Sequence, residues 1–88
     1  MATRVLEICK KFDIKVSYFV DNNSSKWKGK FKNYDIVSPD FLLLENPSNI
    51  FILVASMYYR QISQQLVSMG FTEYTNFLFG LDIESVNL

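Results

Sequence analysis

The sequence predicts a small α/β protein, with a mainly parallel sheet of about three or four strands between two layers of helices. Three observations predict this fold class. Residues 50–55 form an apolar run without polar alternation, which is typical of a strand covered on both faces. Residues 58–69 follow with helical periodicity, and helical and strand-like segments alternate along the rest of the chain. A strand, a tight turn and a returning helix are the repeating half of a parallel sheet.

The helix of this unit is expected within residues 56–70. Ser56 is a good N-cap, because its hydroxyl can accept a hydrogen bond from a free backbone N–H of the first turn. Gly70 supplies the left-handed C′ residue that often ends a helix. The apolar positions, with Tyr59 and Val67 on their flanks, are Tyr58, Ile62, Leu66 and Met69.

The N-terminal third predicts one helix and one strand. Residues 4–12 are expected to form an amphipathic helix capped by Thr3, with its apolar face made of Val5, Ile8, Cys9 and Phe12. Residues 15–20 begin as an alternation and end as an apolar run, so they predict a strand. Residues 21–25 are turn formers. Residues 26–33 have no clear period and are expected to be a loop with one helical turn.

The middle and the end of the chain predict two further strands and a short helix. Residues 34–37 predict a short edge strand. The Ser-Pro-Asp sequence at residues 38–40 is a strong helix start, and this helix must end before Pro47. Residues 74–79 predict the last strand. The tail, residues 81–88, is weakly patterned and is expected to be loosely held.

Length and composition narrow the class of protein. The chain has 88 residues, 49% of them apolar, so it is expected to fold as one globular domain over residues 1–88. So small a core is marginal, which favours a homo-oligomer or a partner domain. The formal net charge of zero argues against a dedicated binder of nucleic acid or of an anionic membrane. With no signal peptide or membrane-spanning run and one cysteine, Cys9, a cytoplasmic protein with a buried thiol is expected.

Four short motifs resemble a known module. They are FVDN at residues 19–22, KWKG at residues 26–29, VSPDFL at residues 37–42 and YYRQISQQL at residues 58–66. Together they resemble the small Rossmann-like module of bacterial surface-polysaccharide enzymes. That module is attached to sugar methyltransferases and nucleotide-sugar dehydratases, and it is similar to the N-terminal domain of sugar acyltransferases that bind a UDP-sugar. Over residues 4–80, the resemblance implies a nucleotide-binding scaffold, with NAD or a nucleotide-sugar as its ligand.

The chain also departs from that module. In the module a first strand and a glycine-rich turn precede the first helix and let phosphates approach the backbone. Here the only glycines are Gly29, Gly70 and Gly80, and none is placed for that task. The absent strand would lie between residues 16–20 and residues 51–55. These two strands are therefore expected either to pair with each other or to be paired by another chain.

Six residues are candidates for a nucleotide site. Asp21 ends a strand, where a carboxylate can accept hydrogen bonds from ribose hydroxyls; the alternative is an aspartate that caps the turn. Asn22 lies beside it, and Lys26 is a candidate phosphate contact. Ala55 and Ser56 end the central strand, where small residues and free N–H groups can receive a ligand or simply pack and cap a helix. Tyr58, like its neighbour Tyr59, can stack on a base or sugar or pack on the sheet.

The sequence gives little indication of nucleic-acid binding, catalysis or metal binding. Lysines at positions 26, 28, 30 and 32 alternate with Trp27 and Phe31 in a pattern that suits either a single-stranded nucleic-acid groove or a solvated loop with aromatics tucked inward. The neutral chain favours the solvated loop. The absence of histidine excludes a His-based triad or zinc site within one chain, and no catalytic or metal-binding residue is assigned.

Three functional hypotheses follow. The first is a non-catalytic accessory module, related to the sugar-nucleotide enzymes of polysaccharide biosynthesis, that binds nucleotide weakly or not at all beyond Val20 and Ala55. The second is an interaction module that self-associates through its sheet. The third is a fragment of a sugar-modifying transferase or dehydratase whose phosphate loop comes from a neighbouring domain.

Overall fold

The structure is a computed structural model that describes residues 1–83. Its chain forms two compact units, which are described separately. The helical unit contains Met1–Lys15 and the chain from Pro47 onward. The hairpin unit is Val16–Asn46. The assignment of residues 1–88 to one domain remains a prediction.

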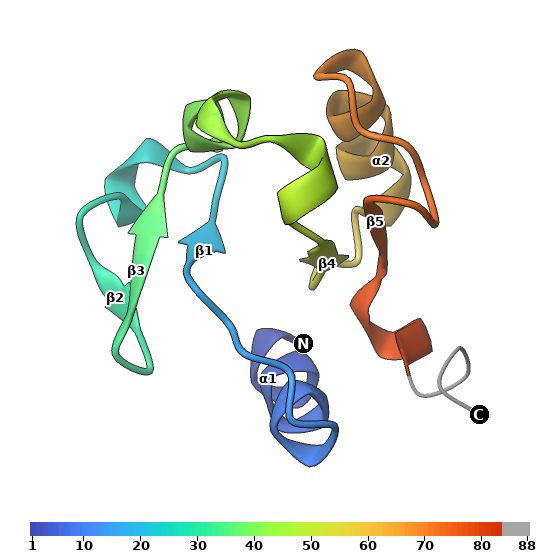
Figure 1. Ribbon diagram of the computed structural model, residues 1–88. Helices are drawn as coiled ribbons and strands as arrows, with labels where there is room; N and C mark the ends of the chain where they lie inside the picture. The colour runs from blue at the N-terminus through green and yellow to red at the C-terminus, as the bar shows by residue number, and fades with distance from the viewer. Residues whose placement is uncertain (84–88) are drawn as a thin grey trace. The chain divides into compact units, whose positions relative to one another are not determined.

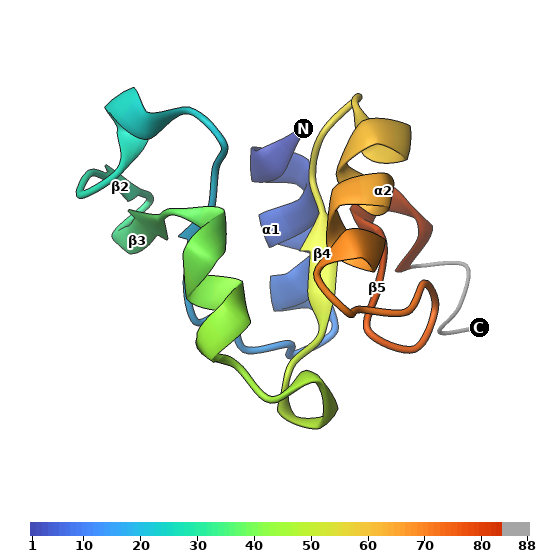
Figure 2. The same cartoon turned by 90° about the horizontal axis from the view of Figure 1, so that it is seen from above.

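The helical unit is built around a parallel strand–helix–strand motif. Its helices and strands are α1 (Ala2–Lys11), β4 (Ile52–Val54), α2 (Tyr59–Ser68) and β5 (Phe77–Phe79), with short 3-10 helices at Pro47–Asn49 and Gly80–Asp82. Strands β4 and β5 pair in parallel, and α2 lies in the connection between them. In Figures 1 and 2, β4 lies between α1 and α2. The predicted strand–turn–helix unit, and its parallel return, are confirmed.

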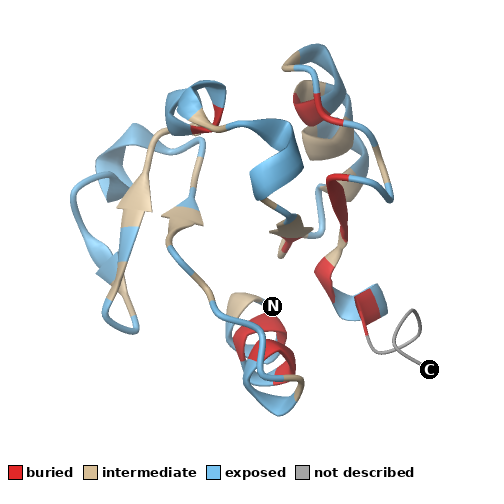
Figure 3. Ribbon diagram, viewed as in Figure 1, coloured by how far each residue is buried: buried red, intermediate tan, exposed pale blue. Residues whose placement is uncertain are grey.

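Helix α1 buries the face that its sequence pattern predicts. Val5, Ile8 and Cys9 are buried, and Phe12 packs beside the helix on the cluster of Ile8, Leu78 and Ile83. The helix begins two residues earlier than expected, with Met1 rather than Thr3 in the N-cap position. Figure 3 shows that buried residues concentrate in α1, in β5 and in the 3-10 helix after it.

Helix α2 begins later than predicted and turns a different tyrosine inward. Ser56 Oγ accepts a hydrogen bond from Tyr58 N at 3.1 Å, so Ser56 stabilises the turn before the helix and not the helix itself. Tyr59 packs against Phe79 and Phe77, with ring centroids 5.5 and 6.5 Å apart, whereas Tyr58 is 68% exposed. The assignment of Tyr58 to the apolar face was therefore wrong. Gly70 has a φ of +100° directly after the helix, which confirms the predicted stop.

The hairpin unit contains a mixed sheet. Its strands are β1 (Phe19–Val20), β2 (Lys30–Phe31) and β3 (Tyr34–Val37), in the order β1-β3-β2. Strand β1 is parallel to β3, and β2 is antiparallel to it. Two 3-10 helices, Ser24–Lys26 and Pro39–Leu44, flank the sheet. As predicted, Ser38 caps the second one, with Oγ 3.2 Å from Asp40 N, although this segment is a 3-10 helix and not an α-helix.

The hairpin of β2 and β3 is the element that sequence analysis missed. Phe31 pairs with Tyr34, so only Lys32 and Asn33 form the loop, and their φ angles are +49° and +74°. Two consecutive residues at positive φ define the tight turn that suits the twist of a hairpin. This turn lacks the glycine that normally announces it, so the segment looked like a plain loop. As a consequence β3 is a central strand, and its prediction as an edge strand was wrong.

The predicted three-layer parallel sheet is therefore wrong. The structure has a three-stranded mixed sheet and a separate two-stranded parallel sheet, and β1 and β4 belong to different sheets. Part of the reason is strand length. Of residues 15–20 only Phe19 and Val20 pair; at this register Ser17 lies opposite Tyr34, where β3 begins, so the residues before it have no partner in β3. The run at residues 50–55 likewise shortens to three paired residues, and Phe51 is 47% exposed.

The end of the described chain is held more firmly than predicted. Leu81 and Asp82 lie in a 3-10 helix, and Ile83 belongs to the core cluster of the helical unit. The rest of the tail prediction, residues 84–88, falls outside the described residues. Within residues 1–83 the structure has no helix with both the length and the apolar character that a membrane crossing requires.

Candidate functional site

The carboxyl ends of β1 and β3 meet at one edge of the mixed sheet. The two strands are parallel, with Phe19 opposite Ile36 and Val20 opposite Val37. Asp21 N continues the ladder by donating to Val37 O at 3.1 Å. Asp21 and Ser38, the residues that follow the two strands, are thus brought to the same edge. In open α/β sheets such an edge is the usual place for a ligand.

Asp21 is the organising residue of this edge. Its Oδ1 accepts a hydrogen bond from Asn23 N at 2.8 Å, and its Oδ2 lies 3.7 Å from Lys26 Nζ. Its carbonyl oxygen accepts a 2.7 Å hydrogen bond from Trp27 Nε1. The turn-capping role proposed for Asp21 is confirmed, and its role as a ribose acceptor remains a prediction. The structure brings Lys26 to Asp21 as expected, while Asn22 is an exposed neighbour in the same loop.

The loop between β1 and β2 is closed by its own hydrogen bonds. Asn23 Oδ1 accepts from both the backbone N and the Oγ of Ser25, at 3.0 and 2.8 Å. At the far end, Lys28 N donates to Ile36 O, and Ile36 N donates to Gly29 O. Two residues thus face one across the hairpin, as in a β-bulge, and Lys28 has a φ of +68°. Bulges of this kind redirect a side chain at the margin of a sheet.

A hollow of ≈ 370 Å³ lies beside this loop and within the hairpin unit. Trp27 and Phe41 line it together with Lys28, Asp35 and the residues 36–38 at the end of β3. This hollow was not predicted from the sequence, because Phe41 was considered only as part of a helix and not as a lining residue. One signal could have revealed it. If β3 is placed beside the loop, the KWKG and VSPDFL segments, residues 26–29 and 37–42, come close together in space.

Tyr18 and Glu45 hold the 3-10 helix that carries Phe41. The Tyr18 hydroxyl donates to Glu45 Oε1 at 3.0 Å, and its ring lies 6.4 Å from that of Phe41. Burial, followed by the hydrogen bond and the negative charge of Glu45, raises the pKa of Tyr18 to about 12. The neutral phenol is therefore favoured by folding.

We expect this pKa shift to appear as alkaline destabilisation of the hairpin unit. Since the folded pKa of Tyr18 lies above the unfolded value of about 10, its contribution is complete below about pH 10. That contribution is lost as the pH rises toward about 12. Tyr18→Phe should remove a tyrosine that ionises near pH 12 in an ultraviolet titration, and Tyr58→Phe is the exposed control. If Tyr18→Phe instead removes a tyrosine that ionises near pH 10, the hydrogen bond from Tyr18 to Glu45 is contradicted.

The other predicted site residues lie in the helical unit. Ala55 and Ser56 follow β4, and both are half-buried. Tyr58, two residues after Ser56, is 68% exposed. Ser56 Oγ accepts from Tyr58 N in the turn before α2, so the prediction of Ser56 as the helix N-cap was wrong. A ligand contact for these three residues remains a prediction.

The lysine-rich run does not form one continuous basic groove. Lys30 pairs with Asp35 at 2.6 Å, and Lys32 lies over the ring of Phe31 at 6.0 Å from its centroid. Phe31 itself packs edge-to-face on Phe19, with centroids 5.1 Å apart. The inward position expected for Phe31 is confirmed.

Two observations concern reactive groups. Cys9 is buried, as expected, and burial raises the pKa of its thiol, which disfavours the nucleophilic thiolate. In residues 1–83, cysteine and acidic side chains do not gather in groups of three or more that could hold a metal ion.

Comparison with known proteins places the chain in a family. A family model described as C2185-like, N-terminal matches residues 1–77, so the chain belongs to the C2185-like N-terminal family. Searches of curated proteins and of solved structures found no match.

Proposed function

We propose that this chain is a non-catalytic module that binds a nucleotide or nucleotide-sugar weakly, at the carboxyl ends of β1 and β3. The relationship to sugar-nucleotide enzymes of polysaccharide biosynthesis is part of this proposal and derives from the sequence resemblance. The observation that carries the proposal is Asp21, a fixed carboxylate at the joined ends of two parallel strands with Lys26 beside it.

The chemistry of this edge suits a ribose phosphate. Oδ1 of Asp21 is oriented by Asn23 N, yet each carboxylate oxygen can accept about two hydrogen bonds, so acceptor capacity remains for ribose hydroxyls. Lys26, whose side chain is 58% exposed, supplies a mobile positive charge for a phosphate. A glycine-rich phosphate loop is absent from the sequence, so we expect a dissociation constant of about 1 mM, equivalent to about 4 kcal/mol of binding free energy.

An amide NMR titration tests this proposal. We expect UDP-glucose and NAD at millimolar concentration to shift the amide signals of Asp21 and Asn22 in a saturable manner, and Ser56 is to be followed as the candidate from the helical unit. Asp21→Asn retains the turn but loses the charge, and it should weaken binding about fivefold to tenfold, because a neutral amide oxygen accepts a weaker hydrogen bond than a carboxylate does. Asp40→Asn, at another exposed aspartate, is the matched control. Unchanged signals at Asp21 and Asn22 would refute nucleotide binding.

Exposed apolar side chains favour a second candidate function, an interaction module that self-associates. Four large residues expose more than about two-thirds of their surface: Leu44 at 83%, Met57 at 82%, Tyr74 at 72% and Tyr58 at 68%. In addition, β1 ends the mixed sheet, and β4 and β5 form a sheet that consists only of edges. Unpaired strand edges are templates for pairing with another chain.

Sedimentation velocity distinguishes this second function. A module that pairs through its sheet is expected to sediment as a dimer or larger species at micromolar concentration. A charged residue should disfavour pairing of the β4 edge, so Phe51→Lys, at an exposed position next to β4, should shift the population toward monomer. A wild-type chain that remains monomeric across the micromolar range would exclude the interaction module.

A further inference from the structure

The hollow beside β3 has two aromatic walls that are held in place before any ligand arrives. Trp27 Nε1 donates to Asp21 O at 2.7 Å, which fixes the plane of the indole. Phe41 is held from behind by the Tyr18 ring and by the 3-10 helix that Ser38 caps. Trp27 is 36% and Phe41 49% exposed, so both rings still present surface to solvent. Pre-organised aromatic surface binds flat rings at a low entropic cost.

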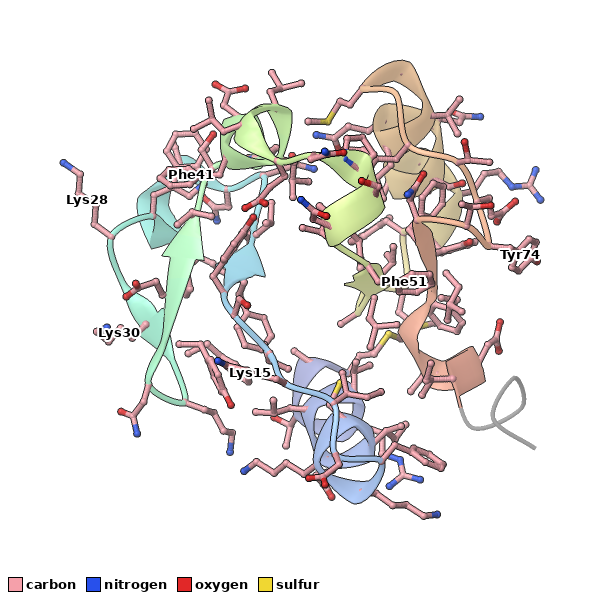
Figure 4. The ribbon with its side chains drawn as sticks, viewed as in Figure 1. Lys15, Lys28, Lys30, Phe41, Phe51 and Tyr74 are labelled. Carbon is pink, nitrogen blue, oxygen red and sulfur yellow. The ribbon has the colours of Figure 1, made fainter. Side chains whose placement is uncertain are left out.

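The lining of the hollow contains two charged residues, Lys28 and Asp35. Lys28 lines the hollow, and within residues 1–83 its ammonium forms no ion pair. Figure 4 shows Lys28 extending from the loop before β2 outward, away from Phe41, so its ammonium lies outside the aromatic part of the hollow. Asp35, the acidic residue of the lining, is neutralised by Lys30 at 2.6 Å. The hollow thus combines two aromatic side chains with a lysine at its rim whose ammonium points outward.

The Trp27–Asp21 hydrogen bond connects this hollow to the proposed ribose position. A ribose that hydrogen-bonds to the Asp21 carboxylate is adjacent to the indole, because the carbonyl of the same residue binds Trp27 Nε1. A nucleobase is the part of a nucleotide that is joined to the ribose and has a flat π-face. A sugar ring beyond the phosphates would lie farther from Asp21.

We infer that the Trp27–Phe41 hollow is the subsite for the nucleobase, which stacks on the indole, while Lys26 beside Asp21 remains the phosphate contact. This inference rests on the proposed function, since it assigns the base of the nucleotide that Asp21 is proposed to hold. Stacking on an aromatic side chain uses the π-face of the base and not the hydrogen-bonding groups at its edge. Every base has such a face, so we expect similar affinities for different bases. The ligand class is thus a nucleoside phosphate and not a free sugar phosphate.

Tryptophan fluorescence tests the inference directly, because Trp27 is the only tryptophan of the chain. We expect UMP to change Trp27 emission in a saturable manner, and ribose 5-phosphate, which has no base, to change it much less. Phe41→Leu removes one wall without touching the Trp27–Asp21 bond, and it should weaken UMP binding about fivefold to tenfold. Leu44→Ala, in the same 3-10 helix but 83% exposed, is the matched control and should not change the affinity.

The outcomes separate this inference from the proposed function. If UMP shifts the amides of Asp21 and Asn22 but leaves Trp27 emission unchanged, the base lies elsewhere; the inference fails while nucleotide binding stands. An equal response to ribose 5-phosphate, or an unchanged affinity in Phe41→Leu, also overturns it. If UMP changes neither the amides nor the emission, both proposals fail. Circular dichroism of each variant verifies that the fold is retained.

Discussion

Replacing Asn76 with alanine is expected to lower the free energy of unfolding of the helical unit by about 2–4 kcal/mol. Asn76 is only 8% exposed, and its amide joins two loops. Oδ1 accepts from Thr72 N at 2.8 Å, and Nδ2 donates to Pro47 O at 2.9 Å. Alanine leaves both of these partly buried backbone groups without a partner, and each then costs about 1–3 kcal/mol.

Urea unfolding followed by far-ultraviolet circular dichroism measures this effect, because both α-helices belong to the helical unit. The midpoint should fall while the slope stays constant. The control is Asn49→Ala, an exposed asparagine in the 3-10 helix Pro47–Asn49, which should change the stability by less than about 0.5 kcal/mol. Equal stability of the two variants would show that the Asn76 amide does not bridge the loops.

The second large effect is expected for Gly80→Ala, which should destabilise the helical unit by about 1–3 kcal/mol. A Cβ at Gly80 would lie 2.8 Å from Val5 Cγ2 and 2.9 Å from Val5 Cγ1, with Val54 O at 3.3 Å. A helical valine is nearly confined to one rotamer, so Val5 cannot swing aside. Relief therefore requires α1 or the chain after β5 to move.

A double-mutant cycle identifies the cause of this destabilisation. Val5→Ala alone should also destabilise, since it leaves a cavity at a buried position. In the double variant the methyl groups no longer collide. Its loss of unfolding free energy should therefore be smaller than the sum of the two single losses by about 1 kcal/mol or more. Strict additivity, measured by the same urea unfolding, would contradict close packing of α1 on Gly80.

Features determined by local sequence were predictable. The apolar spacing of residues 4–12 identified most of the buried face of α1, including Val5 and Cys9, although Leu6, which is also buried, was not on the predicted face. The apolar run before α2 and Gly70 after it defined the strand–helix unit. These signals lie within a few residues of the structure that they specify.

Features determined by pairing were not predictable. Whether residues 26–31 form a loop or a strand depends on the turn at Lys32 and Asn33, which adopts positive φ without a glycine. That turn converts an expected parallel sheet into a mixed one. Likewise, nothing in the sequence indicated that Asn76 would reach back to Pro47 across the fold.

The candidate site was half visible in the sequence. Asp21 and Lys26 were identified because turn formers and a lysine directly follow an apolar run, and the structure places them 3.7 Å apart. The hydrogen bond from Trp27 to Asp21 and the approach of Phe41 depend on how the loop closes and on the position of the 3-10 helix. Neither can be inferred from residue spacing.

The side-chain N–H signal of Trp27 tests directly whether a nucleotide binds beside Asp21 and Trp27. The chain has one tryptophan, so its indole gives a single cross-peak in an NMR correlation spectrum. We expect this proton to exchange slowly with solvent, because it binds Asp21 O, and to shift saturably as a nucleotide is added. A rapidly exchanging indole proton that stays unmoved at millimolar nucleotide would contradict both the hydrogen bond and nucleotide binding.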